Sequence, residues 1–202
     1  MTDTKAIIET IHYVLHKLGR VDKLKILKLI FFSDKYHLLR YGRTITGDDY
    51  YAMYCGPVAS TVKDVLEFSN FLSEEDKKMV KGFFNKVGDN DLELKKMDMV
   101  MEYDMLSESD MKAIDATIEK FGAMTSIDLS NYTHKYPEWY QYDDMFRNNK
   151  TKRQRIKNEE LLSVIKEDRD FFAVDEADIE ESRKILTGLI ASERTGTCIR
   201  AS

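Results

Sequence analysis

The segment between Asp22 and Tyr41 limits the fold more than any other part of the sequence, because its apolar residues follow two lines of one helix. The first line contains Leu24, Leu27, Phe31 and Leu38, and the second contains Leu29, Phe32, Tyr36 and Leu39. A helix that is apolar on more than one side is normally buried. Asp22 can cap its start and Gly42 can end it. We therefore expect a buried helix here.

Asp34 stands in the first of these lines, where an apolar residue would be expected. A buried carboxylate loses its hydration, and it needs charge-assisted or backbone hydrogen bonds to offset that loss. We therefore expect Asp34 to organise the groups around it.

The rest of the chain predicts a mostly helical fold. Two prolines and nine glycines in 202 residues favour long helices over the many turns of a sandwich. Helical spacing or capping signals cover residues 4–18, 57–69, 73–80, 107–121, 125–132, 158–168 and 176–186. The fold class is therefore α+β and predominantly α-helical, a compact helical domain with one small strand or hairpin element.

The strand content is expected to be small. Residues 50–55 are aromatic enough for a short strand, which Gly56 and Pro57 would end. Pro57 would then stand in the first turn of the next helix, where proline is well tolerated. A small hairpin or ribbon could also form within residues 91–102.

The chain divides into three parts by pattern. Its length favours a single core domain, which we place at residues 1–150. Residues 151–186 form a charged helical extension packed on or near this domain. Residues 187–202 lack helical periodicity and are expected to be a flexible tail.

Composition and simple sequence patterns argue against several classes of function. With 36 acidic and 31 basic residues the net charge is −5, which gives no global attraction to nucleic acid or anionic lipid. The start lacks the pattern of a signal peptide, and no stretch reaches the roughly 18 apolar residues of a membrane helix. Cys55 and Cys198 fit no disulfide framework, and the pair His12 and His16 lacks a third metal ligand. We expect a cytoplasmic protein with no cofactor and no metal.

Two blocks of sequence form an ordered series of short motifs. The first block comprises Lys28 to Leu38 (KLIFFSDKYHL), Tyr41-Gly42-Arg43, Ile45-Thr46-Gly47-Asp48 and Gly56-Pro57-Val58. The second block comprises Leu106-Ser107-Glu108-Ser109-Asp110, Phe121-Gly122, Thr133-His134 and Trp139. This ordered series resembles the Panacea domain of the SocA-like antitoxin family. The series is more specific than any one piece, and the resemblance covers roughly residues 5–145.

The resemblance implies a non-enzymatic antitoxin that binds and neutralises a cognate toxin protein encoded by an adjacent gene. Some members of the family instead act as adaptors that deliver the toxin to an ATP-dependent protease. The toxins paired with the family are chemically diverse, so the resemblance does not identify the partner. Nucleic acid is at most a secondary partner, and no membrane is involved.

The candidate partner-binding residues are polar and aromatic side chains near the bend at Gly56 and Pro57. They are Asp34, Tyr36, His37, Tyr41, Arg43, Tyr51 and Tyr54, to which Trp139, the only tryptophan, is added. Tyrosine, tryptophan and arginine dominate binding hot spots. In the structural alternative, Asp34 pairs with Arg43 inside the protein, the tyrosines fill the core, and Trp139 is a buried anchor.

A hydrolase is an alternative from another class. It would use Cys55 as a nucleophile, together with His37 or His134 and with Asp34. Spacing alone cannot show the required geometry, and a buried, inert Cys55 is the expected arrangement.

Two charged segments leave further alternatives open. The basic run at residues 147–157 could contact promoter DNA or an acidic toxin surface, but a solvated loop is the simpler interpretation. The acidic stretch at residues 167–181 could enter a basic cleft of a toxin. Equally, its Phe171 and Phe172 could dock on the domain.

Overall fold

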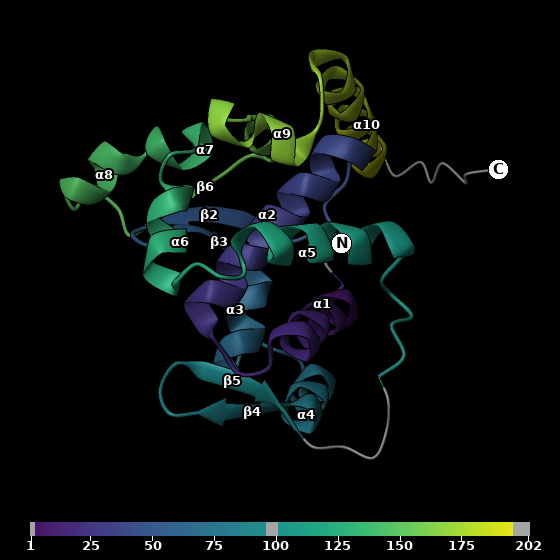
Figure 1. The fold of residues 1–202 in the computed structure, drawn as a ribbon, viewed down its shortest axis with the longest axis vertical. Helices are drawn as coiled ribbons and strands as arrows, with labels where there is room; N and C mark the ends of the chain where they lie inside the picture. The colour runs from purple at the N-terminus through teal and green to yellow at the C-terminus, as the bar shows by residue number, and fades with distance from the viewer. Residues whose placement is uncertain (1–2, 96–100, 196–202) are drawn as a thin grey trace.

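The computed structural model describes residues 3–95 and 101–195, with residues 189–195 described by their backbone alone. Helix α2 (Lys23–Tyr41) runs through the middle of the molecule (Figure 1). The helices α5 and α6 pack along it, and α10 packs at its C-terminal end. The buried helix expected from the two apolar lines is thus confirmed.

The other elements surround α2. The remaining helices are α1 (Thr4–Leu18), α3 (Ser60–Glu67), α4 (Glu74–Phe83), α5 (Glu108–Phe121), α6 (Ser126–Thr133), α7 (Pro137–Tyr140), α8 (Asp143–Arg147), α9 (Arg169–Phe172) and α10 (Glu176–Thr195), with 3-10 helices η1 (Asn158–Leu162) and η2 (Lys166–Asp168). The strands are β1 (Val21–Asp22), β2 (Tyr50–Met53), β3 (Gly56–Ala59), β4 (Phe84–Val87), β5 (Asp91–Leu94) and β6 (Arg153–Arg155). The predicted class, α+β and predominantly α-helical, is confirmed.

The described strands form two three-stranded antiparallel sheets, in the orders β1-β5-β4 and β3-β2-β6. The sequence led us to expect less strand than this: a short strand at residues 50–55, which corresponds to β2, and a small hairpin within residues 91–102, where β5 is found. Residues 96–100 of the expected hairpin region lie outside the described residues. Strand β1 is two residues long, and β6 lies within a charged run, so neither shows the alternating pattern that reveals a strand.

The segment at Gly56 and Pro57 is a strand, and its prediction as a strand end followed by a helical turn was wrong. The chain reverses after Met53, which pairs with Gly56, and Pro57 then pairs with Ala52 in β2. The next helix, α3, begins only at Ser60. The physical reason is that Gly56 adopts a φ of +98°, which lets β3 fold back on β2.

The basic run at residues 147–157 contains β6, so the expected solvated loop was wrong for this part. Gln154 pairs with Ala52 of β2. The backbone N–H of Ile156 then donates to the Tyr50 carbonyl oxygen at 2.9 Å. The arginines on either side of Gln154 remain exposed, which explains why the run looked like a solvated segment.

The predicted helix caps are present. The Asp22 carboxylate accepts a hydrogen bond from the Lys25 backbone at 3.0 Å, and Gly42 ends α2 with a φ of +71°. The N-terminus of α5 has a capping box, in which Ser107 and Asp110 each bind the other's backbone. These local signals fix the ends of the two helices that make the most extensive contact with each other.

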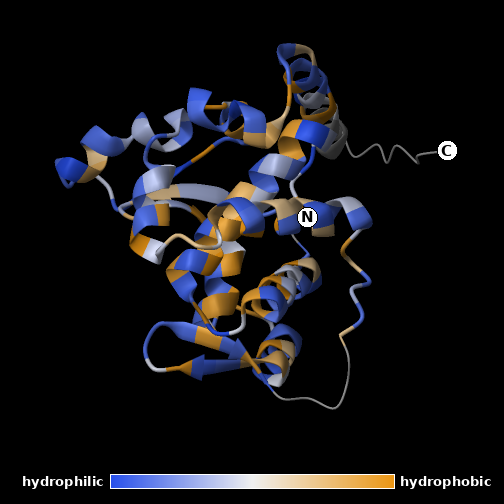
Figure 2. Cartoon of the chain, viewed as in Figure 1, coloured by the Kyte–Doolittle hydropathy of each residue, from blue (hydrophilic) through white to orange (hydrophobic). Residues whose placement is uncertain are grey.

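The core is built around the aromatic residues of α2. The Phe32 ring stacks on Phe121 of α5 with 4.2 Å between ring centroids, and Tyr136 packs edge-on against both Phe31 and Phe32. Hydrophobic residues gather on the central helices, and the outer loops and helices are mostly hydrophilic (Figure 2). Among the described residues, no helix is long and apolar enough to cross a membrane.

A buried ion pair ties α2 to the C-terminal half of the domain. The Lys35 ammonium lies 2.6 Å from the Glu138 carboxylate of α7, and both side chains are fully buried. Lys35 also donates to the Leu161 carbonyl oxygen of η1 at 2.7 Å, while Ser163 donates to Glu138 at 2.5 Å. The pair is therefore satisfied from several sides, as a buried pair must be.

The C-terminal extension packs on the end of α2. Phe172 is fully buried, and Phe171 lies 5.2 Å from Tyr36 between ring centroids. Ser182 of α10 donates to the Leu39 carbonyl oxygen at 2.9 Å. The docking of the two phenylalanines, one of the two alternatives for the acidic stretch, is thus the arrangement found.

Helix α10 is longer than the sequence predicts. We expected it to end near Leu186, with an irregular tail from residue 187, but it continues to Thr195. The prediction was wrong for residues 187–195 because a helix does not need an apolar stripe where it projects from the domain. The rest of the predicted tail, residues 196–202, lies outside the described residues, as does Cys198.

We predict that Glu138→Ala lowers the free energy of unfolding by about 3–5 kcal/mol, because it leaves the Lys35 charge buried without a counterion. Urea denaturation monitored by circular dichroism measures the change. The matched control is Glu67→Ala, which breaks the partly exposed Lys63–Glu67 pair and should cost less than about 1 kcal/mol. The double variant Lys35→Met/Glu138→Leu should recover part of the loss, and equal losses in E138A and E67A would contradict this account.

Candidate functional site

Lys28 holds the β2–β3 hairpin against α2. Its side chain is fully buried, and its ammonium group donates to the Pro57 carbonyl oxygen at 2.7 Å. Thr133 Oγ1 and Lys28 Nζ occupy the space where a side chain at Gly56 would begin. Burial lowers the pKa of Lys28 to about 7, so near neutral pH the charged form carries a substantial cost.

Asp34 holds the loop that precedes the hairpin, as its position in the apolar line predicts. Its carboxylate accepts hydrogen bonds from the Ile45 and Thr46 backbone at 2.8 and 3.0 Å. It also accepts from the Thr46 hydroxyl, and from the Tyr50 hydroxyl at 2.7 Å. Burial raises the pKa of Asp34 to about 6 despite these donors. In this structure Asp34 has internal partners.

His37 belongs to a second cluster near the C-terminal end of α2. Its Nδ1 lies 2.9 Å from the Arg43 carbonyl oxygen, and its Nε2 lies 3.0 Å from the Asp110 carboxylate. Arg43 reaches the same carboxylate at 2.9 Å, and the Tyr41 ring lies 4.5 Å from the His37 ring. The internal pairing of Asp34 with Arg43, offered as an alternative, is therefore wrong, because Arg43 pairs with Asp110.

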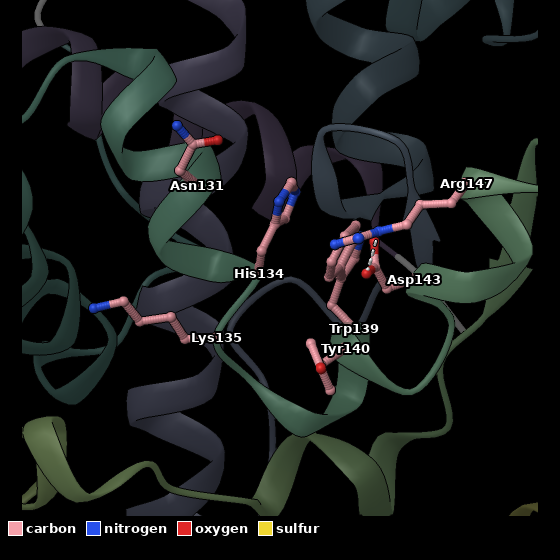
Figure 3. Close-up of a pocket in the computed structure, with 7 residues that line it drawn as sticks. All are labelled: Asn131, His134, Lys135, Trp139, Tyr140, Asp143 and Arg147. Carbon is pink, nitrogen blue, oxygen red and sulfur yellow. Dashed lines mark ion pairs between the residues drawn. The ribbon is translucent and has the colours of Figure 1, made fainter.

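A hollow of about 370 Å³ lies beside α6, α7 and α8 (Figure 3). We call the residues around it, together with Tyr54 of the neighbouring hairpin tip, the Trp139 surface. The residues that line the hollow are Asn131, His134, Lys135, Trp139, Tyr140, Asp143 and Arg147.

Trp139 forms the floor of this surface. Its ring lies flat against His134, with 3.6 Å between ring centroids and 7° between ring planes. Its indole Nε1 donates to the Met53 carbonyl oxygen at 2.7 Å, which ties α7 to the hairpin. The side chain is 4 % exposed, so the expected burial of Trp139 as an anchor is confirmed.

Two exposed tyrosines flank this anchor. Tyr54 follows Met53 in the hairpin turn and is 76 % exposed, while Tyr140 follows Trp139 and is 65 % exposed. Because the Trp139–Met53 hydrogen bond joins their neighbours, the two tyrosines belong to one region of the surface. Large exposed aromatic side chains on a fixed backbone are suited to protein contacts.

Arg147 of α8 also lines the hollow, and its side chain pairs with Asp143 there (Figure 3). Its Nε is 2.7 Å from the Asp143 carboxylate, one helical turn earlier. Lys135 instead points away from the group, and its ammonium lies 4.5 Å from the centre of the Tyr132 ring. Burial and the nearby Lys28 charge lower the pKa of His134, so its ring is neutral at pH 7.

A smaller hollow of about 230 Å³ lies on the β3-β2-β6 sheet. Tyr51 is part of its wall, and the guanidinium of Arg153 lies 4.0 Å from the centre of the Tyr51 ring. Phe71, at the edge of this hollow, is highly exposed. The structure therefore places Tyr51 in a different hollow from Trp139.

The eight candidate partner-binding residues do not form one cluster. Asp34, His37 and Trp139 are buried, Tyr36 packs against Phe171, and Tyr41 with Arg43 belongs to the Asp110 cluster. Tyr51 and Tyr54 lie on the hairpin. Contact of these residues with a partner stays a prediction, and it applies directly to the exposed members.

Sequence reasoning missed Tyr140 and Asp143, considered Arg147 only as part of the basic run, and considered His134 only as a motif position and as a base for Cys55. One usable signal was present: Asp143 and Arg147 are spaced to form an ion pair on one turn of helix. That signal was hidden because Arg147 was assigned to a solvated basic run.

Cys55 is exposed, so the expectation that it is buried was wrong. It lies in the hairpin turn, where its carbonyl oxygen accepts from Ser130 at 2.7 Å. Of its suggested catalytic partners, His37 points to Asp110, and Asp34 is enclosed by the loop it binds. In the part of the chain that the structure describes, no group of three His, Cys, Asp or Glu side chains is placed to hold a metal ion.

In a comparison with protein families, residues 26–140 fit a family described as antitoxin SocA-like, Panacea domain. The match spans more than half of the 202 residues. It includes α2 from Ile26 onward, the β2–β3 hairpin, α5 and α6, and it ends at Tyr140 of the Trp139 surface. Comparisons with curated proteins and with solved structures gave no match.

The buried Lys28 should make stability depend on pH. Because its pKa falls from 10.5 to about 7 on folding, the unfolded state holds more protons in between. The free energy of unfolding should therefore rise by about 2 kcal/mol between pH 7 and pH 9. Asp34 has finished titrating below this window.

The measurement is urea denaturation at both pH values, in the wild-type protein and in Lys28→Met. The variant should lose this rise, whereas the exposed-site control Lys63→Met should keep it. An identical pH dependence in wild type and K28M would contradict the account.

Proposed function

Because the chain belongs to the SocA-like antitoxin family with a Panacea domain, we propose that it neutralises a protein toxin by binding it directly. In this mechanism the antitoxin covers the active surface of the toxin in a stoichiometric complex. Slow dissociation is sufficient for inhibition, and no catalytic turnover is needed.

The family match is the observation that carries this proposal, and the Trp139 surface supports it. Binding free energy at protein interfaces concentrates in a few aromatic and arginine side chains. The Trp139 surface offers Tyr54, Tyr140 and Arg147 on elements that are tied to α2 by internal hydrogen bonds. Side chains on a fixed backbone lose little entropy on binding, which favours a tight complex.

The exposed edge of the Asp110 cluster is a possible second contact region. Tyr41 is 47 % exposed, and the Arg43 side chain is 45 % exposed. The buried residues Asp110 and His37 contact Arg43 and Tyr41 from inside the protein. In the proposal these two buried residues position the exposed ones and do not contact the toxin themselves.

The chief alternative is that the protein delivers the toxin to an ATP-dependent protease. A protease-docking segment would then be needed, and the sequence offers the tail at residues 187–202 for it, of which residues 196–202 lie outside the described residues. The hydrolase alternative has one supporting observation, the exposure of Cys55. Both alternatives make predictions that differ from direct occlusion.

We predict that co-expression with the product of the neighbouring gene restores growth and yields a purifiable complex. Tyr54→Ala and Tyr140→Ala should each weaken the complex about tenfold or more, because each removes an exposed aromatic anchor. Affinity measured by isothermal titration calorimetry checks this. The matched control is Ile127→Ala, which removes an exposed apolar side chain outside the hollow and should leave affinity unchanged.

Two further comparisons separate the alternatives. Rescue that disappears in a protease-deficient host would favour the adaptor. Rescue that disappears in Cys55→Ala, with the complex intact, would favour the hydrolase. Neither rescue nor a complex with the wild-type protein would contradict direct neutralisation of that partner.

A further inference from the structure

We propose that the hollow on the β3-β2-β6 sheet is one half of a symmetric interface between two copies of this chain, in which Phe71 of each copy enters the hollow of the other. We call it the Phe71 hollow. It shares no lining residue with the hollow of the Trp139 surface, so the inference does not depend on the proposed function. It follows from an exposed ring, the apolar hollow beside that ring, and two opposite charges that have no partner within the described residues.

Phe71 is 92 % exposed, more than any other large apolar residue that the structure describes. It lies in the turn between α3 and α4, where its backbone N–H donates to Ser69 Oγ at 3.2 Å. The next residue, Leu72, is buried in the core. The ring is therefore presented from a turn that is held on both sides, and such a side chain loses little entropy on binding.

The Phe71 hollow offers an apolar space of fitting size. Its volume is about 230 Å³, and Tyr51, Met53 and Val58 form part of its walls. Phe71 stands at the edge with its ring in solvent, so the chain's own ring does not fill the hollow. A single exposed apolar side chain is common on protein surfaces. An exposed ring beside an apolar hollow is different, because a second copy supplies the ring that the hollow can hold.

Arg153 of β6 supplies a positive charge at this hollow. Its guanidinium group lies over the Tyr51 ring, 4.0 Å from the ring centre. The Thr151 hydroxyl holds its backbone, accepting from the N–H at 3.3 Å and donating to the carbonyl oxygen at 2.7 Å. A guanidinium stacked on a ring keeps the N–H groups at its edge available. Within the described residues no carboxylate pairs with this group, so its N–H donors are available to a partner.

Asp64 of α3 supplies a negative charge at the same hollow. Its side chain is half-buried, and among the residues that the structure describes it has no ion pair and no side-chain hydrogen bond. Lys63, which also lines the hollow, is already paired with Glu67 at 2.6 Å. The hollow therefore presents one available cation, Arg153, and one available anion.

These features match one another across a two-fold axis. In a two-fold interface the same patch serves both copies, so every contact between two different residues occurs twice. This patch carries both members of each contact: Phe71 with the hollow, and Asp64 with Arg153. Opposite charges that meet across an interface favour the matched partner. A partner of another kind needs only one member of each contact on this chain, so the presence of both favours a second copy.

Sedimentation velocity of the full chain, without toxin, measures the association directly. The wild-type protein should dimerise with a Kd on the order of 10 µM, as expected of a small interface with few anchors. Phe71→Ala should raise that Kd about a hundredfold, roughly tenfold for each of the two symmetric contacts. The matched control Ile127→Ala removes an exposed apolar side chain outside the hollow and should change nothing. A wild-type protein that is still monomeric at about 300 µM, or an F71A variant that dimerises like wild type, would overturn the proposal.

Charge-reversal variants test the two-fold pairing. Asp64→Arg and Arg153→Asp each place like charges opposite each other twice, so each variant alone should be monomeric where the wild-type protein is dimeric. An equal mixture of the two should dimerise, because D64R then meets R153D with opposite charges at both positions. Glu119→Arg, a reversal at an exposed position outside the hollow, should leave dimerisation unchanged. Wild-type dimerisation in either single variant, or a mixture that stays monomeric, would contradict the interface.

Toxin affinity keeps this inference apart from the proposed function. Tyr140→Ala should weaken the toxin complex and leave dimerisation unchanged, whereas F71A should weaken dimerisation and leave the toxin complex unchanged. If F71A weakens the toxin complex and the free wild-type protein shows no dimer, the Phe71 hollow receives the toxin and the second copy is the wrong occupant.

Discussion

Four buried polar side chains of α2 determine where the surrounding segments can lie. Lys28 binds the β2–β3 hairpin, and Lys35 binds α7 and η1. Asp34 and His37 both bind the loop between α2 and β2, and His37 also binds α5. Each group would lose several kcal/mol if it were buried without its partner. Alternative packings of those segments are therefore penalised, and the four groups favour one arrangement over others more than they add net stability.

This arrangement explains why the block from Lys28 to Leu38, which carries part of the family resemblance, lies largely inside the protein. The block from Lys28 to Leu38 combines an apolar helix with the four polar groups, and a sequence with this combination must supply matching segments elsewhere. This block therefore belongs to the scaffold of the fold. The exposed side chains of the Trp139 surface, such as Tyr140 and Arg147, depend on this scaffold for their position while making few demands on it themselves.

Elements whose signal is local could be predicted from the sequence. The caps at Asp22 and Ser107, the burial of α2 and the organising role of Asp34 follow from spacing and from the cost of burying a carboxylate. Strand β6 could not, because its partner β2 is distant in sequence. Strand β3 and the exposure of Cys55 were missed because the turn between Met53 and Gly56 carries none of the Asn-Gly or Asp-Gly signals of a tight hairpin. Pro57 by itself is typical of a first helical turn, and only its pairing with Ala52 of β2 shows that it belongs to a strand.

The candidate site was predictable only in part for the same reason. Trp139 could be identified as an anchor, but its partners His134 and Met53 come from two other segments, which only the folded scaffold brings together. The surface therefore depends on the scaffold for its geometry, whereas the scaffold depends little on the exposed side chains. Under the proposed function, we expect loss of Glu138 to weaken binding through loss of stability, and loss of an exposed side chain such as Tyr140 to weaken binding with stability unchanged. Measuring unfolding beside affinity separates a residue that supports the surface from one that touches the partner.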